Sequence, residues 1–114
     1  MVIEQAEVWW AGLDEPTGSE AGYRRSVVVV QGTALNRSRI GTVVCVPPTS
    51  SLKWANAPGN LLLPRHEMGL SKDSVANVFL IVALDRQQLT ERVRKVPPRR
   101  LPLILAGIDT HLGR

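Results

Sequence analysis

Four consecutive valines, residues 27–30, constrain the fold of this chain more than any other stretch of its 114 residues. Valine is stiff and favours strands over helices. An unbroken apolar run of this length predicts a strand that is covered on both faces, here over residues 25–31. Arg24, Arg25 and Ser26 directly precede the valines. The sequence therefore predicts a buried strand that begins with two permanent positive charges.

Other short apolar runs, separated by turn residues, predict further strands. They cover residues 6–14, 41–47, 60–64, 74–85 and 91–96. Trp9 and Trp10 are adjacent, so on a strand they point to opposite faces, and at least one belongs to the core. We therefore expect a mostly β protein that forms one domain over residues 1–114.

Only in the C-terminal segment do the apolar residues recur at helical spacing. They are Leu101, Ile104, Leu105, Ile108 and Leu112. Pro102 fits a helix only in its first turn, so the helix should begin near Arg99 or Arg100. The expected architecture is a small β-barrel with a helix at its C-terminal end.

The formal net charge of +4 and a pI near 10.0 favour an anionic partner. A nucleic acid or an acidic protein segment fits this charge better than a membrane surface does. Cys45 is the single cysteine and lies in an apolar run, which predicts a buried thiol in a reducing compartment. With no leader and no apolar run of membrane-spanning length, we expect a cytoplasmic protein that does not enter membranes.

Few residues offer metal or nucleophile chemistry. Cys45, His66 and His111 are far apart in sequence, so we expect neither a metal site nor a cofactor. No glycine-rich phosphate loop and no nucleophile elbow are present. An acid–base pair of His66 and His111 stays open beside the alternative that both are surface residues.

One arrangement does favour chemistry at a phosphate. If the strands at residues 25–31 and 41–47 are antiparallel neighbours, the start of the first meets the end of the second. Arg25 then lies near Thr49, and a guanidinium beside a hydroxyl suits a phosphate. The alternative is a surface arginine that binds a turn carbonyl.

Several segments together resemble one known family. They are "VWWAGLDEPTGSEAGYRRSVVVVQ", "NRSRIGTVVCVPPTS", "APGNLLLP" and "GLSKDSVANVFLIVALDRQQLTERV". In this combination they resemble the MazF/PemK (Kid-like) toxins of type II toxin–antitoxin systems, over about residues 6–96. The resemblance implies an SH3-like β-barrel of the plasmid-maintenance-toxin kind that acts as a homodimer. It also implies a metal-independent endoribonuclease that cuts single-stranded RNA, commonly mRNA, and an antitoxin whose acidic, flexible segment covers the RNA site.

The resemblance also assigns roles to residues. Arg25 and Thr49 match the family's catalytic arginine and threonine, and Glu20 matches a position linked to the active site in some members. The RNA-binding candidates around them are Ser19, Arg24, Ser50, Lys53, Trp54, Ser74 and Asn77. The chain departs from the family pattern at Ser26, where a proline is usual, and at Pro48, where an aliphatic residue is usual.

Two other functions remain open for the same fold. CcdB-like relatives poison DNA gyrase and cut nothing, but they rely on C-terminal residues that the ending "GIDTHLGR" lacks. A nucleic-acid-binding barrel without catalysis would use Arg25 only as a phosphate contact.

Overall fold

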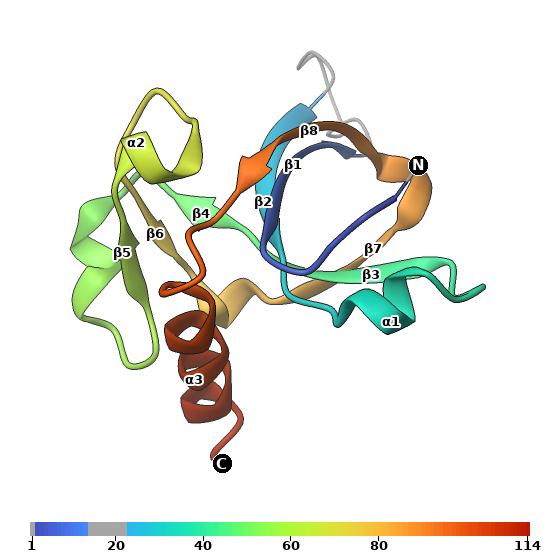
Figure 1. The fold of residues 1–114 in the computed structure, drawn as a ribbon. Coiled ribbons are helices and arrows are strands. Elements are labelled where there is room, and N and C mark those ends of the chain that lie inside the picture. Colours follow the sequence, from blue (N-terminus) through green and yellow to red (C-terminus); the bar gives the residue numbers. More distant parts are fainter. Residues whose placement is uncertain (1, 14–22) are drawn as a thin grey trace.

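The computed structural model describes residues 2–13 and 23–114, which form two antiparallel sheets and a C-terminal helix (Figure 1). Within these residues the larger sheet has the strand order β7-β3-β2-β1-β8 and the smaller has the order β4-β6-β5. The strands are β1 (Glu7–Leu13), β2 (Tyr23–Val29), β3 (Thr42–Val46), β4 (Pro48–Thr49), β5 (Leu61–Leu63), β6 (Ser74–Ala76), β7 (Val82–Asp85) and β8 (Leu89–Lys95). The α-helices are α1 (Thr33–Asn36), α2 (Arg65–Met68) and α3 (Leu101–His111). Short 3-10 turns lie at Leu52–Asn56, Val78–Leu80 and Arg86–Gln88. The predicted mostly β fold with a C-terminal helix is confirmed.

The larger sheet curls into a barrel (Figure 1). Its two edge strands, β7 and β8, follow one another in the chain and are joined by the 3-10 turn Arg86–Gln88. Leu84 of β7 and Leu89 of β8 pack in the same buried cluster as Trp9 of β1. The two edges of the sheet therefore meet around one apolar interior.

The valine run is buried on both faces, as predicted. Val27 and Val29 belong to the cluster inside the barrel, whereas Val28 and Val30 belong to a second cluster. That second cluster also contains side chains from the smaller sheet and from α3. Because side chains alternate along a strand, β2 supplies both cores at once.

The single strand predicted for residues 74–85 is wrong. The segment forms β6 in the smaller sheet, then the 3-10 turn Val78–Leu80, then β7 in the larger sheet. Asn77 causes the break, because its side-chain oxygen accepts a hydrogen bond from the Phe79 N–H at 3.3 Å and caps the turn. The chain thereby crosses from one sheet to the other.

Helix α3 begins where we predicted from the position of Pro102. Arg100 is its N-cap, and Pro102 lies in its first turn. Its buried side begins at Ile104. Gly107 packs against Gly59 so closely that a Cβ at Gly107 would overlap the Gly59 carbonyl oxygen. The helix therefore rests directly on the backbone of the loop before β5.

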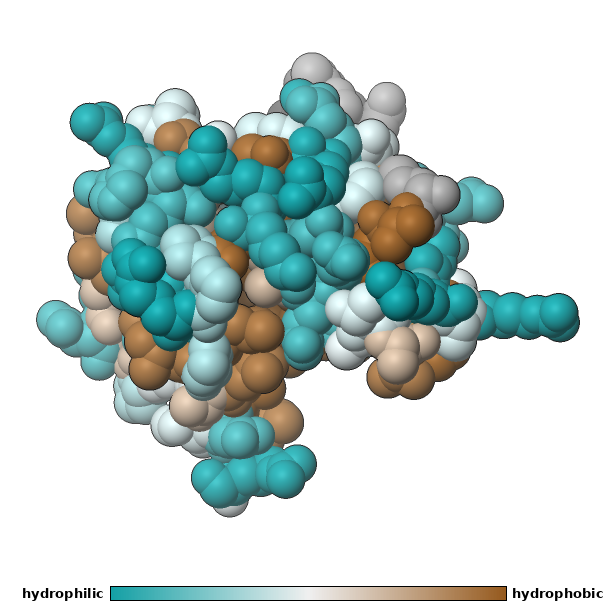
Figure 2. Space-filling model, in the orientation of Figure 1, coloured by the Kyte–Doolittle hydropathy of each residue, from teal (hydrophilic) through white to brown (hydrophobic). Residues whose placement is uncertain are grey.

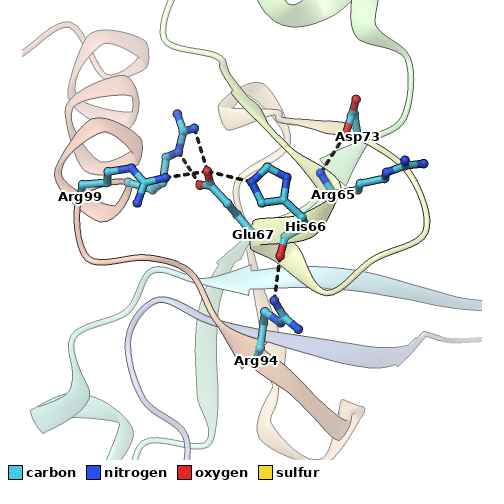
Figure 3. Close-up of polar contacts among 7 residues, drawn as sticks. Arg65, His66, Glu67, Asp73, Arg94 and Arg99 are labelled. Carbon is cyan, nitrogen blue, oxygen red and sulfur yellow. Dashed lines mark hydrogen bonds and ion pairs between the residues drawn. The ribbon is translucent and has the colours of Figure 1, made fainter.

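Charged contacts fasten α3 to α2 (Figure 3). Glu67 of α2 is only 8% exposed and accepts hydrogen bonds from Arg100 Nε at 2.8 Å and from Arg99 Nη2 at 2.7 Å. The hydrogen bond from Arg100 is the main reason that the pKa of Glu67 lies below its ordinary value. We call this group of Glu67, Arg99 and Arg100 the carboxylate clamp.

The surface is largely polar over α2 and β8, and apolar surface gathers around α3 (Figure 2). Leu103 and Leu112, on α3 and at its end, are 51% and 58% exposed. Among the described residues, none of the helices has the length and apolar character needed to cross a bilayer.

Candidate active site

Arg25 lies on β2, one residue before Ser26 and the valine run, and its backbone is paired with Ala11 of β1. Strand β2 runs antiparallel to β3, with Val28 opposite Val46, so the start of β2 meets the chain that leaves β3. The guanidinium Nη2 donates a hydrogen bond to the Pro48 carbonyl oxygen at 3.1 Å. The antiparallel pairing that we inferred from the sequence thus brings Arg25 to the residue before Thr49.

Thr49 is held in a defined position by its own strand and turn. Its backbone is paired with Val75 of β6, and its hydroxyl oxygen accepts a hydrogen bond from the Ser51 N–H at 3.2 Å. A hydroxyl that accepts one bond still has its proton to donate. The Thr49 side chain is half-buried and is therefore available to a ligand.

Arg25 and Thr49 line one hollow of about 430 Å³, which we call the aromatic hollow. Its lining residues are Arg25, Thr49, Trp54, Asn77, Phe79 and Leu80. Trp54 and Phe79 are 46% and 47% exposed, although both are large and apolar. Exposed aromatic faces beside a cation and a hydroxyl suit the stacking of a base next to a bound phosphate.

The charge of Arg25 has no carboxylate partner within ion-pair distance among residues 2–13 and 23–114. The Pro48 carbonyl holds one donor in place without neutralising the cation. A guanidinium carries five N–H donors, so most remain for an anion. Within the described residues, Arg25 therefore combines a fixed position with a positive charge that no carboxylate neutralises.

Arg24 is differently placed. It is exposed, its Nη2 pairs with Glu91 Oε1 of β8 at 2.9 Å, and its guanidinium lies over the Trp10 ring at 4.6 Å. Of the two adjacent arginines, Arg25 lines the hollow that contains Thr49, and Arg24 packs across the outside of the sheet.

The other candidates fall into three groups. Lys53 and Trp54 lie together on the 3-10 turn after Thr49, with Lys53 Nζ at 5.5 Å from the Trp54 ring. Asn77 lines the aromatic hollow, and Ser50 and Ser74 line a neighbouring hollow that also contains Arg25. Ser19 and Glu20 lie outside the described residues.

Sequence reasoning missed Phe79 and Leu80 as site residues. Both were assigned to the interior of a strand, yet they lie on the 3-10 turn and are about half exposed. The Phe79 ring packs at 4.9 Å from the His111 ring of α3, so the C-terminal helix supports the wall of the site. The available signal was Asn77, which interrupts the apolar run.

The cysteine and the histidines contribute little to this site. Cys45 is fully buried, and this burial raises its pKa to about 12, so the thiol stays protonated and inert. His66 is exposed on α2, and His111 is exposed at the end of α3, close to the site only through its contact with Phe79. In the described part of the chain, no three side chains of the metal-ligating types gather.

The sequence and the fold are similar to those of known proteins. Residues 4–112 match the model of a family described as PemK-like, MazF-like toxin of type II toxin–antitoxin system. Endoribonuclease MazF6 of Mycobacterium tuberculosis is 45% identical over 97 residues, which cover 85% of each chain. Endoribonuclease EndoA of Bacillus subtilis is 29% identical over 93 residues, covering 82% of this chain and 79% of that one. A crystal structure of MazE-MazF from Deinococcus radiodurans superposes with a TM-score of 0.81 and 26% identity, covering 99% of this chain and 97% of that one.

Proposed function

The chain belongs to the family of PemK-like, MazF-like toxins of type II toxin–antitoxin systems, and we propose that it is an endoribonuclease with its active centre at Arg25 and Thr49. The observation that carries this proposal is the placement of Arg25. Its guanidinium is anchored on the carbonyl of Pro48, beside Thr49, and meets no carboxylate in the described residues. The relatives named as endoribonucleases support the same reaction.

The substrate that fits this site is single-stranded RNA, commonly mRNA. RNA carries its own nucleophile, the 2′-hydroxyl beside the scissile phosphate, so alignment and charge stabilisation suffice without a metal. The 2′-oxygen attacks phosphorus and loses its proton, while the bond from phosphorus to the 5′-oxygen breaks. The 5′-oxygen takes up a proton. The products are a 2′,3′-cyclic phosphate (or its hydrolysed form) and a 5′-hydroxyl.

Arg25 stabilises the charge that develops on the phosphate oxygens. Its planar donors match two oxygens of one phosphate and bind the pentavalent state more tightly than the ground state. Because the Pro48 carbonyl already orients the side chain, little reorganisation is needed at the moment of reaction. Proton donation from Arg25 to the leaving oxygen is secondary, since a guanidinium stays charged in proteins and gives up its proton only reluctantly.

Thr49 and Glu20 complete the proposed chemistry. The Thr49 hydroxyl donates to a phosphate oxygen and fixes the phosphate against Arg25. Glu20 accepts the proton of the 2′-hydroxyl, which requires hydrogen-bond reach in the RNA complex. Thr49→Ser keeps the hydroxyl and should retain most activity, whereas Thr49→Ala should lose activity by roughly tenfold or more, the effect of one lost hydrogen bond to a charged group.

The remaining candidates hold the RNA on either side of the cut. Trp54 stacks on a base, and Lys53 and Arg24 attract the phosphate backbone. Ser19, Ser50, Ser74 and Asn77 complete the groove. The protein acts as a homodimer in the cytoplasm and is neutralised by a MazE-like antitoxin, whose acidic flexible segment suits the +4 charge of the chain.

The test is cleavage of a defined single-stranded RNA in the presence of a chelator, with mapping of the product ends. We expect cleavage by the wild-type protein with 2′,3′-cyclic phosphate and 5′-hydroxyl ends, and a cleavage rate lower by about 10²–10³ or more in Arg25→Ala. Inhibition of gyrase supercoiling without RNA cleavage would instead identify a CcdB-like toxin. RNA retention without cleavage would identify a binding module.

A further inference from the structure

The segment 91–100, "ERVRKVPPRR", contains five cations and one acid in ten residues. It covers most of β8 and ends at the N-cap of α3, and the proposed chemical step uses none of its residues. Four of the five cations lie within 4.0 Å of a carboxylate oxygen: Arg92 of Glu7, Lys95 of Glu4, and Arg99 and Arg100 of Glu67. Arg94 has no such partner among residues 2–13 and 23–114.

Arg94 is nevertheless held in place. Its Nη1 donates a hydrogen bond to the His66 carbonyl oxygen of α2 at 2.7 Å. Its side chain also packs over Gly69, the left-handed residue that ends α2, where a Cβ would come within 2.7 Å of Arg94 Nε. The arrangement resembles that of Arg25, because in both cases a neutral carbonyl orients a guanidinium and leaves most of its donors for an anion.

The surroundings of Arg94 add positive charge. Arg94 on β8 and Arg99 before α3 both reach α2, from different sides (Figure 3). The carboxylate clamp has two guanidinium groups for one carboxylate, so it keeps a net positive charge, and the Arg99 side chain is 67% exposed. The exposed acid of this region, Asp73, accepts a hydrogen bond from the Arg65 N–H at 2.8 Å and therefore lies beside another cation. The face formed by α2, β8 and the start of α3 is thus basic.

This basic face begins at the edge of the proposed active centre. A hollow of about 370 Å³ that Arg25 lines is also lined by Gly69 and Lys72, in the loop after α2. Gly69 also packs against Arg94. Lys72 is exposed and lies within 4 Å of no carboxylate in the described part of the chain. A chain that leaves the hollow past Lys72 therefore meets Arg94 and then the clamp.

Two kinds of polyanion suit such a face, the phosphate backbone of RNA and an acidic protein segment. The continuity with the hollow favours RNA, because the strand that is cut must continue beyond the active centre on both sides. Guanidinium and ammonium groups that contact phosphates bind them irrespective of the base sequence. The basic face should therefore add affinity for a longer RNA without adding sequence preference.

We propose that Lys72, Arg94 and Arg99 form a phosphate track, which binds the RNA on one side of the segment that is cut. Arg94 is its central contact, and Lys72 connects it to the active centre. The proposal rests on the proposed ribonuclease function and names a further binding surface for the same substrate. The chemical step stays with Arg25 and Thr49.

The test is equilibrium binding of RNAs that carry a 2′-deoxy group at the cut and so stay intact. A short RNA has about five nucleotides around the cut, and two long RNAs extend it by about six nucleotides on the 5′ or the 3′ side. Arg94→Gln removes the charge but keeps a donor for the His66 carbonyl. One long RNA should bind this variant about fivefold more weakly at about 0.1 M salt, with the slope of log affinity against log salt shallower by about 0.7. The short RNA should bind as it does to the wild type.

Two further variants are the controls. Arg39→Gln removes an exposed arginine that follows α1, on the other side of the barrel from α2 (Figure 1), and should bind all three RNAs as the wild type does. Arg94→Lys keeps the charge and should keep the wild-type salt slope. If Arg94→Gln does not fold, Arg99→Gln replaces it, because Arg100 still pairs with Glu67 in that variant. We then expect the same loss, restricted to the same long RNA.

Equal losses for the short and long RNAs would overturn the proposal, because Arg94 would then act through the active centre or the fold. Unchanged binding of both long RNAs would overturn it as well. Binding of an oligoglutamate peptide provides the alternative. If Arg94→Gln weakens binding of this peptide and leaves both long RNAs unaffected, the face binds an acidic protein segment and not RNA.

The same measurements separate the track from the proposed function, since binding is measured without cleavage. A wild-type protein that cleaves no RNA, but whose binding of one long RNA depends on Arg94, would remove the ribonuclease function and keep the track. Cleavage by the wild type, with no dependence of binding on Arg94 at any RNA length, would keep the function and remove the track.

Discussion

Arg100 at the start of α3 and Arg25 on β2 are both partly buried, but their guanidinium groups meet opposite surroundings. Arg100 donates both Nε and Nη2 to the Glu67 carboxylate, and Arg99 adds a third hydrogen bond to the same group (Figure 3). Arg25 bonds only the neutral Pro48 carbonyl within the described residues. The first arginine is neutralised by a carboxylate, and the second is held in place with no carboxylate partner in the described part of the chain.

The difference separates the structural use of an arginine from the catalytic use that we propose for Arg25. A buried carboxylate with two guanidinium partners fastens two elements, and removal of one partner leaves a charge without compensation. A cation fixed by a carbonyl keeps its charge available for a ligand, which for Arg25 is the RNA phosphate in the proposed function. The same residue type therefore has opposite expected phenotypes in the carboxylate clamp and at the active centre.

The largest expected effects come from replacing Arg25 or Arg100 with alanine. Arg25→Ala should lower the rate of RNA cleavage by about 10²–10³ or more, the usual cost of a lost preorganised donor, with the melting temperature nearly unchanged. Arg100→Ala should lower the melting temperature, while the folded fraction cleaves at the wild-type rate. Single-turnover cleavage and thermal melts of both variants provide the measurement. Equal losses of stability in the two variants would remove the distinction.

Glu67→Gln tests the clamp from its acidic side. The amide keeps the shape of the side chain but cannot neutralise Arg99 and Arg100, so the melting temperature should fall by several degrees. Glu91→Gln is the matched control, because Glu91 is 65% exposed and its pair with Arg24 contributes little to stability. If both variants melt at the same temperature, the clamp contributes no more than a surface ion pair.

The clamp should also depend on pH. The pKa of Glu67 is lowered by its hydrogen bond from Arg100, so the folded state binds a proton less readily than the unfolded state. Its contribution to stability is complete above the unfolded value near 4.5 and is lost as the pH falls through the lower folded value. Urea unfolding should therefore show that wild-type protein loses more stability than Glu67→Gln between pH 6 and about pH 3. Parallel losses in the two proteins would contradict this.

The proximity of Arg25 and Thr49 was predictable because it follows from a single topological step. The valine run identifies β2, and its antiparallel pairing with β3 brings Arg25 to Thr49 with no knowledge of the remaining chain. Helix α3 was predictable for an equally local reason, since Pro102 is compatible only with its first turn. Both predictions depend on neighbours in sequence or on one strand pair.

The clamp and the walls of the two hollows were not predictable in the same way. Glu67 and Arg100 are 33 residues apart, and α2 is too short at four residues to have a periodic pattern. Phe79 has the apolar character of a core residue, but it lies on the 3-10 turn that Asn77 caps and is 47% exposed. These features arise from contacts between elements that the hydrophobic pattern alone does not specify.

The smallest expected effect is that of Arg24→Ala, which removes the arginine adjacent to Arg25. Arg24 is already paired with Glu91 and packed over Trp10, so it can serve RNA only as an outer phosphate contact. A full contact with a single-stranded phosphate contributes about 0.7 to the slope of log affinity against log salt, and Glu91 should reduce that share. We therefore expect the slope of log affinity against log salt to be shallower in Arg24→Ala, by less than about 0.7. The cleavage rate at saturating RNA should stay within about threefold of wild type.

The control is Arg39→Ala, which lies at an exposed position and should change neither the slope nor the cleavage rate. A hundredfold loss of rate in Arg24→Ala would mean that both arginines act on the scissile phosphate, and the assignment of catalysis to Arg25 alone would be wrong.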